Sequence, residues 1–509
     1  MRLLYIDIDS CRPDHLGCYG YHRNTTPHID ALAREGMIFR QCYTADAPCL
    51  PSRTALYSGR FGIQTGVVGH GGSAANPKIQ GAGRGFRDWF DEQGLARQLQ
   101  KLGLHTAMIS PFGQRHAAHW FYAGFNEIHN TGQCGMESAE EVWPVTDEWL
   151  RRRAAGDSWF LHVNLWDPHT PYRAPAGCGH PFKDDPLPAW LADPAVLARH
   201  QRMTGPHTAL DVGMYDDRVD PRYALRQPGA LTDQAQLRRL IDGYDTGVRY
   251  ADDFIGRMVA QLKAAGVYDE TAIIVSADHG ENLGELGIYA EHGTADAATC
   301  RIPLVVKWPG GARGSNDRLH YNIDLAPTLM EMLGGECQPL WAGRSFAAAL
   351  RPGDQGTGRD ELVLSQCAHV CQRSVRFGPW LYLRTYHDGH HLFPPEMLFD
   401  LEQDPHEQHD LTAARPELCR EGAWRLARWH DAQMQEMAHR AGDVVDPLWT
   451  VMREGGPFHA RSVSPGNPEG GRAGLQRYIE RLKKTGRADG AARLAERLGD
   501  GGWQQSVPR

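Results

Sequence analysis

The chain has 509 residues, more than one hydrophobic core usually supports, so two or more domains are expected. Its 62 acidic and 54 basic residues leave a net charge of -8. That balance argues against a broad surface for nucleic acid or another polyanion, although it leaves a local basic pocket open. No segment approaches the roughly 20 apolar residues that cross a bilayer, so no membrane association is expected.

The beginning of the chain predicts a buried strand rather than a secretion signal. Residues 3–6 are apolar, but Asp7 and Asp9 interrupt the run before it reaches the roughly 7–15 apolar residues of a signal peptide. The 11 cysteines are odd in number and irregularly spaced, which favours reduced thiols over a disulfide framework. We therefore expect a cytoplasmic protein.

The first half of the chain alternates apolar runs with amphipathic segments. We expect strands at residues 3–8, 106–110, 159–165, 272–276 and 304–308, and helices at residues 27–35, 91–102 and 237–265. This alternation predicts a parallel sheet covered by helices on both faces. Ligands of such sheets bind at the carboxyl ends of the strands, and Asp9, His169 and Asp278 each follow a predicted strand.

The remaining segments predict accessory structure. Residues 175–236 are rich in Pro, Asp and Arg, and we interpret them as an insertion that forms a lid or wall on the substrate side, or else a surface excursion without function. Residues 352–358 predict a linker, 374–377 and 380–384 a short antiparallel sheet, 416–438 a helix, 455–471 a loop and 472–498 a helical tail. The expected units are 1–350, 360–440 and 441–509.

The most specific pattern is a short cysteine motif. Residues 48–60 read PCLPSRTALYSGR, so Cys49 and Arg53 frame a Cys-x-Pro-Ser-Arg sequence. This segment resembles the signature of the sulfatase family, in which a maturation enzyme oxidises the cysteine to formylglycine. Residues 24–39, 320–333 and 397–407 resemble other blocks of the family, so the resemblance extends from residue 1 to about residue 415. It implies an alkaline-phosphatase-like α/β fold, with a mixed, mostly parallel sheet between helices and a smaller C-terminal α+β subdomain.

The implied modification of Cys49 is chemically useful. A hydrated aldehyde carries two hydroxyls on one carbon, of which one attacks sulfur or phosphorus while the other collapses to release the anion. A divalent cation beside this group is needed to deprotonate the nucleophile near neutral pH. By resemblance, Arg53 steadies the modified side chain.

The resemblance also implies a metal site. Its ligands would be Asp9, the modified Cys49, Asp278 and His279, and oxygen donors of this kind favour Ca²⁺, with Mg²⁺ or Mn²⁺ as alternatives. The family often has a second aspartate after the first one, but here that position is Ser10. Asp7 lies on the same face of the strand as Asp9 and is the alternative.

Four further residues are candidates for binding a tetrahedral anion. His169 lies in a Pro-His-x-Pro-Tyr sequence of the family, and His292 occupies a position where the family usually has lysine. Histidine there could serve as an anion donor or as the acid for the leaving group. Arg115 and His116 are candidates for a cation and a histidine of another block, and His119 is a weaker one.

Three functions are compatible with these residues. The leading one is hydrolysis of a sulfate monoester, on a carbohydrate or an aryl group; the second is hydrolysis of a phosphonate monoester or phosphodiester at the same site. The third is a non-catalytic homologue with unmodified Cys49. The expected partners are a small-molecule or saccharide sulfate ester and a formylglycine-generating enzyme, and the oligomeric state is open. Four aromatic residues near the motifs could stack on a sugar ring: Trp120, Tyr122, Trp166 and Tyr172.

Overall fold

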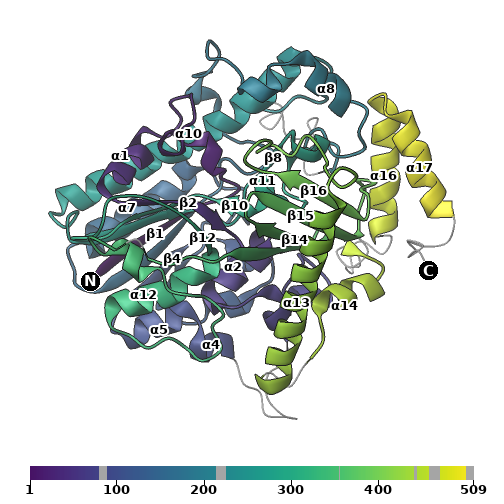
Figure 1. Ribbon diagram of the computed structural model, residues 1–509. Coiled ribbons are helices and arrows are strands. Elements are labelled where there is room, and N and C mark those ends of the chain that lie inside the picture. The colour runs from purple at the N-terminus through teal and green to yellow at the C-terminus, as the bar shows by residue number, and fades with distance from the viewer. Residues whose placement is uncertain (79–88, 214–224, 355, 441–443, 458–469, 500–509) are drawn as a thin grey trace.

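The computed structural model describes residues 1–78, 89–213, 225–354, 356–440, 444–457 and 470–499 (Figure 1). Within these residues, a nine-stranded sheet forms the centre of the molecule. Its strands lie in the order β10 (Arg301–Ile302), β2 (Met37–Tyr43), β11 (Leu304–Lys307), β7 (Thr271–Ser276), β1 (Arg2–Ile8), β6 (Trp159–Leu165), β4 (His105–Ile109) and β5 (Glu127–His129), and β12 (Gly314–Tyr321) pairs with β2.

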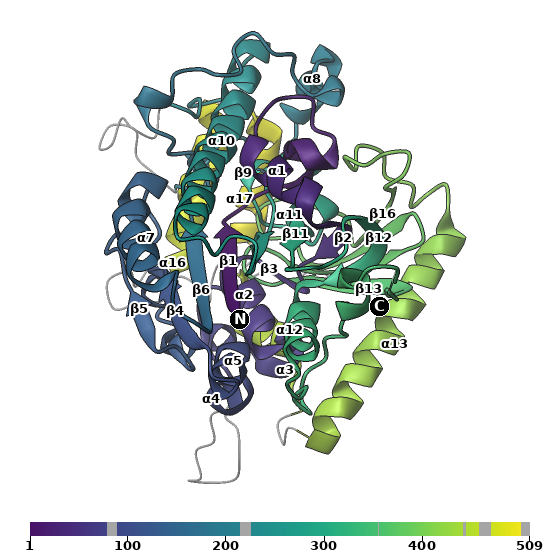
Figure 2. The same ribbon diagram turned by 90° about the vertical axis from the view of Figure 1, so that its left-hand side faces the viewer.

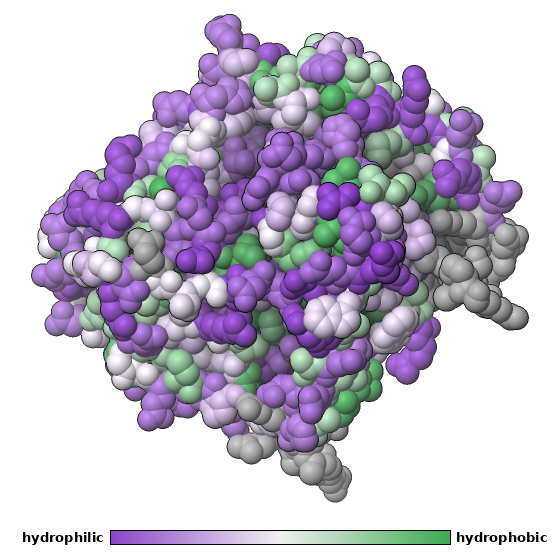
Figure 3. All heavy atoms as spheres, in the orientation of Figure 1, coloured by the Kyte–Doolittle hydropathy of each residue, from purple (hydrophilic) through white to green (hydrophobic). Residues whose placement is uncertain are grey.

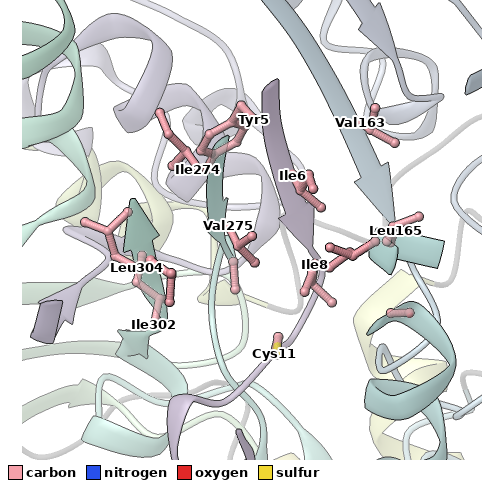
Figure 4. Close-up of a cluster of buried hydrophobic side chains, with 14 of the residues drawn as sticks. Tyr5, Ile6, Ile8, Cys11, Val163, Leu165, Ile274, Val275, Ile302 and Leu304 are labelled. Atoms are coloured by element: carbon pink, nitrogen blue, oxygen red, sulfur yellow. The ribbon is translucent and has the colours of Figure 1, made fainter. Parts of the chain in front are cut away.

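The central strands run in parallel. β1 pairs in parallel with both β6 and β7, and β4 pairs in parallel with β6 and β5, whereas β11 runs antiparallel to β7 and β2. Every residue of β1, β6 and β7 is buried, as expected where helices cover both faces of a sheet. Figure 4 shows the apolar side chains of these strands packed together, among them Ile6, Val163 and Val275. The predicted mixed, mostly parallel sheet is confirmed.

Helices cover the sheet in two groups. The helices α1 (Pro27–Glu35), α7 (Ala139–Arg153) and α10 (Gln234–Ala264) pack together on one face, and α2 (Cys49–Ser58), α5 (Leu95–Lys101) and α12 (Leu325–Leu333) pack together on the other (Figures 1 and 2). The expected helix at residues 91–102 is wrong as a single element. It divides into α4 (Trp89–Gln93) and α5 because Gly94, with ψ of 149°, leaves the helical conformation. A Cβ atom at Gly94 would lie 2.3 Å from the carbonyl oxygen of Phe90, so this close turn of the chain requires glycine.

A second, five-stranded sheet lies beside the first one. Its strands are β16 (Glu396–Asp400), β15 (Trp380–His387), β14 (Cys371–Phe377), β13 (Glu361–Gln366) and β3 (Asp46–Ala47). The four C-terminal strands are antiparallel, as predicted, and α13 (Pro416–Arg440) packs on them. The short β3 was not predicted, and it pairs in parallel with β13 directly before Cys49. The second sheet therefore takes one edge strand from the N-terminal half of the chain, and the division into domains stays a prediction.

The insertion and the tail meet at one edge of the molecule. The insertion holds α8 (Pro194–His200), and its residues 214–224 lie outside the described part, as do residues 458–469 of the predicted loop. The tail forms α16 (Gly470–Lys484) and α17 (Ala488–Gly499), after a short α14 (Pro447–Arg453). The Tyr478 hydroxyl donates to the Thr204 carbonyl, which ties the tail to the insertion.

The described cysteines are unpaired, and the face in Figure 3 carries mainly polar residues. All eleven cysteines lie in the described residues as free thiols. The face seen in Figure 3 is predominantly hydrophilic, with apolar residues in small separate patches. No helix among the described residues is long and apolar enough to cross a membrane.

Candidate active site

The carboxyl ends of the parallel strands bring together the four predicted metal-binding residues. Asp9 follows β1, and its backbone N–H donates to the Leu165 carbonyl at the end of β6. Asp278 and His279 follow β7. Cys49 is the first residue of α2, and one ligand atom of each of these four residues lies within 4.8 Å of the others. All four side chains are buried.

The environment of Cys49 keeps its thiol protonated. Its Sγ atom lies 3.1 Å from Nε2 of His279. Burial, together with the negative charges of Asp9 and Asp278, raises the pKa of the Cys49 thiol well above its ordinary value. Reactive cysteines instead have lowered pKa values and partial exposure. The unmodified Cys49 thiol is therefore a poor nucleophile in these surroundings.

Arg53, one turn further along α2, is surrounded by carboxylates. Its Nε lies 2.6 Å from Oδ2 of Asp7, its Nη2 3.0 Å from Oδ2 of Asp9, and its Nη1 2.7 Å from Oδ2 of Asp278. Burial alone would lower the pKa of Arg53, but these three carboxylates raise it well above its ordinary value. The aromatic ring of Trp166 lies 5.3 Å from the guanidinium carbon. Arg53 is thus held in one position by charge on one side and by an aromatic ring on the other.

A divalent cation fits the charge of this cluster. Three buried carboxylates face one guanidinium, which leaves an excess of negative charge on buried groups. Burial and the nearby charges of Asp9 and Asp7 raise the pKa of Asp278 well above its ordinary value. The ligand atoms are carboxylate oxygens, an imidazole nitrogen and the side chain of residue 49, a set that suits hard or intermediate divalent ions.

Ser10 and Asp7 support this cluster in different ways. The Ser10 hydroxyl donates to Oδ1 of Asp9 at 3.0 Å, and the Ser10 backbone N–H donates to Oδ1 of Asp278 at 3.2 Å. Asp7 accepts from Arg53, and its Oδ2 also lies 3.5 Å from Nε2 of His162. Ser10 therefore orients two of the candidate ligands, while Asp7 holds the arginine.

His169 and His292 lie beside the cluster and differ in protonation. Nε2 of His169 lies 3.9 Å from Oδ1 of Asp9, and burial lowers the pKa of His169 well below its ordinary value. The ring of His292 stacks on that of His279 at 4.3 Å. Burial also disfavours the charged form of His292, but a 3.0 Å hydrogen bond between its Nδ1 and Oε2 of Glu281 outweighs this and raises its pKa. His169 is therefore neutral and His292 is the histidine better able to carry a proton.

The third predicted block lies at the rim of the same site. Arg115, at the end of α6 (Phe112–Arg115), stacks on Trp166 at 5.2 Å, and its Nη1 donates to the Gly135 carbonyl at 3.0 Å. A ring nitrogen of His116 lies within 4.8 Å of the Cys49 Sγ atom. His119, the weaker candidate, is exposed.

Several residues of the site were missed by the sequence analysis. Besides Glu281, which follows the Asp-His pair by two positions, they are His70, Glu291 and His369. A ring nitrogen of His70 lies within 4.8 Å of Cys49 and of His116, and Oε1 of Glu291 lies 2.7 Å from Nδ1 of His369 beside His292. Only the position of Glu281, inside a recognised block, could have indicated its role.

The suggested stacking of Trp166 and Tyr172 on a sugar is wrong. Both side chains are fully buried, Trp166 against Arg53 and Arg115 and Tyr172 with its hydroxyl donating to Glu281. Trp120 and Tyr122 are partly buried and pack against the core.

Several known proteins are similar to this chain in sequence. Residues 2–335 match the sulfatase family, and residues 284–418 match the C-terminal region of N-sulphoglucosamine sulphohydrolase. The multifunctional alkaline phosphatase superfamily protein PehA of Trinickia caryophylli is 26% identical, covering 79% of this chain and 89% of its own length. The choline-sulfatase of Rhizobium meliloti is 25% identical, covering 76% of this chain and 77% of its own length.

Solved structures agree at the level of the fold. The phosphonate monoester hydrolase of Agrobacterium radiobacter superposes with a TM-score of 0.61 at 19% identity, over 84% of this chain and 95% of that one. A protein solved in complex with its substrate D-glucosamine-2-N,6-O-disulfate superposes with a TM-score of 0.63 at 18% identity, over 84% and 97% of the two chains. This chain belongs to the sulfatase family. It is accordingly a hydrolase of that family, with the α/β fold that the resemblance implied.

Proposed function

We propose that this protein hydrolyses a sulfate monoester and that Cys49, matured to formylglycine, is its nucleophile. One observation carries the proposal: the cysteine of the Cys-x-Pro-Ser-Arg motif lies, as a protonated and buried thiol, among Asp9, Asp278 and His279. The motif serine supports this placement, because Ser52 donates to the Asp278 carbonyl at 2.6 Å and so joins α2 to the loop after β7.

The residues of the site have separate roles in this proposal. A divalent cation held by Asp9, Asp278, His279 and the modified residue 49 would supply the charge that makes a hydroxyl nucleophilic near neutral pH. The aldehyde hydrate at residue 49 supplies two hydroxyls on one carbon, one for attack and one for release of the anion.

The surrounding side chains bind the substrate group and move protons. Arg53 neutralises part of the carboxylate charge and fixes the start of α2. Nε2 of His292 lies close enough to the cluster to donate a hydrogen bond to a sulfate oxygen, which stabilises charge as it develops. His169 would donate from Nε2 only when protonated, a form that the negative charge of a bound sulfate favours. The raised pKa of His292 suits it to give a proton to the leaving oxygen.

Hydrolysis of a phosphonate monoester or phosphodiester is the second candidate. Its support is the similarity to PehA and to a phosphonate monoester hydrolase fold. A phosphodiester and a sulfate monoester both present one negative charge on a tetrahedral centre, so the charges of this site suit either.

Two measurements test the proposal. Peptide mass spectrometry of protein made with a competent maturation system should find residue 49 about 18 Da lighter than cysteine. Purified enzyme should then turn over nitrophenyl sulfate faster than a nitrophenyl phosphodiester; the reverse order would favour the second candidate. Cys49→Ala should abolish turnover, whereas substitution of Cys419, a buried cysteine in α13, by Ala should retain it. An unmodified Cys49, or an active Cys49→Ala protein, would show that the mechanism is wrong.

A further inference from the structure

A cavity separate from the catalytic residues lies between the insertion and the tail. Its volume is about 520 Å³. Its charged and polar lining includes Gln201, Arg202, His207 and Asp211 from the insertion and Lys484 and Arg487 from the tail. The two tail residues lie beyond both family matches, which end at residues 335 and 418. The cavity is therefore built in part by a segment outside the matched family regions.

The charge of Arg487 and Asp211 in the lining, together with Arg481 next to them, has an excess of positive sign. Nη2 of Arg487 lies 2.6 Å from Oδ2 of Asp211, and Nε of Arg481 lies 2.8 Å from Oδ1 of the same carboxylate. Nη1 of Arg487 also donates to the Gly205 carbonyl at 2.7 Å. Two guanidinium groups thus share one carboxylate, so these three side chains have a net charge of about +1.

His207 also lines this cavity, and one of its ring nitrogens is unpaired among the described residues. Only 5% of its surface is exposed, and its Nε2 atom has no hydrogen-bond partner among the described residues. Burial, with the nearby charge of Arg487, lowers the pKa of His207 to about 3, so the ring is neutral and Nε2 can donate or accept. A buried polar atom left without a partner costs free energy that a ligand or an ordered water would recover.

Two exposed cations lie at the mouth of the cavity. Arg202 and Lys484 both line it, and the described part of the chain shows no ion pair for either. The wall between them offers hydrogen-bonding side chains from Gln201, Thr232 and Thr485. The lining therefore combines cations, which suit an anion, with neutral polar groups, which suit hydroxyls.

We propose that this cavity is a second ligand site, which binds a sulfated or phosphorylated saccharide unit of one or two rings. The anion would contact Arg202 and Lys484, and the hydroxyls would contact the polar wall and Nε2 of His207. The cavity volume lies in the range of small-molecule sites. Binding there does not require the hydrolytic activity, so the proposal goes beyond the function proposed above.

Calorimetric titration of the full-length protein tests this site with four probes: glucose 6-sulfate, glucose 6-phosphate, inorganic sulfate and glucose. The titrations use a His169→Ala/His292→Ala background, in which the catalytic site is weakened. In this background we expect one binding event for each charged sugar. Arg202→Gln/Lys484→Gln should raise the Kd of that event by about 10-fold or more, because charge-assisted hydrogen bonds are lost. The matched control is Lys483→Gln, because Lys483 is exposed, pairs with Glu480 and does not line the cavity. It should bind as the background does.

The outcomes separate this proposal from the one for the active site. With His169 and His292 intact, the Arg202→Gln/Lys484→Gln variant should turn over nitrophenyl sulfate at the wild-type rate. If the enzyme is inactive but still binds the charged sugars, only the proposed hydrolysis is contradicted. His207→Phe, which removes Nε2, should also weaken binding. Binding that neither set of variants alters would overturn the second site. Binding of glucose as tight as that of glucose 6-sulfate would overturn the anionic class, and equal binding of inorganic sulfate would overturn the saccharide.

Discussion

Glu281 and His292 form a buried pair in which Oε2 of the carboxylate lies 3.0 Å from Nδ1 of the imidazole. The same carboxylate accepts a hydrogen bond from Tyr172 through its other oxygen at 3.1 Å. Glu281 therefore fixes the orientation of the His292 ring and leaves its Nε2 for other contacts. The position that resembles a family lysine is here a histidine with a dedicated carboxylate partner.

Removal of either candidate anion-binding histidine should slow turnover strongly. We expect His169→Ala and His292→Ala to reduce kcat by about 10²-fold or more, as for loss of one donor to the developing charge. Glu281→Gln should retain a hydrogen bond to the ring while it removes the charge, so its kcat should fall by less. The control is His119→Ala, an exposed residue of the weaker candidate position, which should keep the wild-type rate. If His292→Ala has the wild-type kcat, the role given to this residue is wrong.

Substitutions of the carboxylates should separate metal binding from the support of Arg53. Asp9→Asn and Asp278→Asn should lower the bound divalent metal well below one ion per chain, as measured by elemental analysis after dialysis, because each removes a charged ligand. Asp7→Asn should keep the metal, because Asp7 contacts Arg53 rather than the ligand set. Readdition to metal-free enzyme should restore activity best with Ca²⁺; equal metal loss in all three variants would show that Asp7 is a ligand.

A buried ion pair should stabilise the contact between the second sheet and α14. The two terminal guanidinium nitrogens of Arg373 contact Asp446, at 2.7 and 2.8 Å, and Asp446 also caps α14 by accepting from the Leu448 N–H at 3.0 Å. Burial would raise the pKa of Asp446, but a hydrogen bond from His430 and the charge of Arg373 hold it well below its ordinary value. Arg373→Met should therefore cost about 3–5 kcal/mol of stability at pH 7, as for a buried charge left alone.

The pH dependence of this pair has a defined sign. Because the folded pKa of Asp446 is depressed, its full stabilisation is present above the ordinary carboxyl pKa of about 4. It declines below that value and is lost as the pH falls through the depressed folded pKa. Chemical denaturation at pH 7 and pH 3 should show a smaller difference in stability between the wild type and Arg373→Met at the lower pH. Arg351→Met breaks an exposed pair with Glu331 and should change stability by about 1 kcal/mol or less at either pH.

The docking of the tail should weaken in mild acid. His390 stacks on Tyr478 of α16 at 4.7 Å, and burial lowers the pKa of His390 to about 3. The unfolded chain therefore binds a proton below about pH 6.5 that the folded chain excludes, and stability falls from there towards pH 3 by up to about 1.4 kcal/mol per pH unit. Hydrogen exchange of α16 should rise over this range, and less so in His390→Phe, which keeps the stack. His409→Phe, at an exposed histidine, should behave as the wild type; an unchanged slope in His390→Phe would contradict the assignment.

Patterns among neighbouring residues in the sequence predicted much of the fold and the centre of the candidate site. Residues 2–8 form one buried strand because their apolar run has no amphipathic period, and the five-residue motif at Cys49 carries its chemistry in adjacent positions. The strand-end rule placed Asp9, His169 and Asp278 at one edge of the sheet before their distances were known. Boundaries were less predictable: Gly94 interrupts a periodic helix, and a two-residue strand such as β3 has no period at all.

The chain's local patterns thus identify the candidate nucleophile precursor, the candidate metal ligands and the strands that carry them, because neighbouring residues encode both the strand and the side chain at its end. The surroundings of Cys49 come from packing between distant segments. His369 reaches Glu291 and His292 from the second sheet, and Arg53 acquires three carboxylates from two separate strands. Such contacts leave no periodic trace in the sequence, since each depends on how whole elements pack together. Tertiary structure therefore sets the charged and hydrogen-bonding surroundings of the cysteine and of the two histidines.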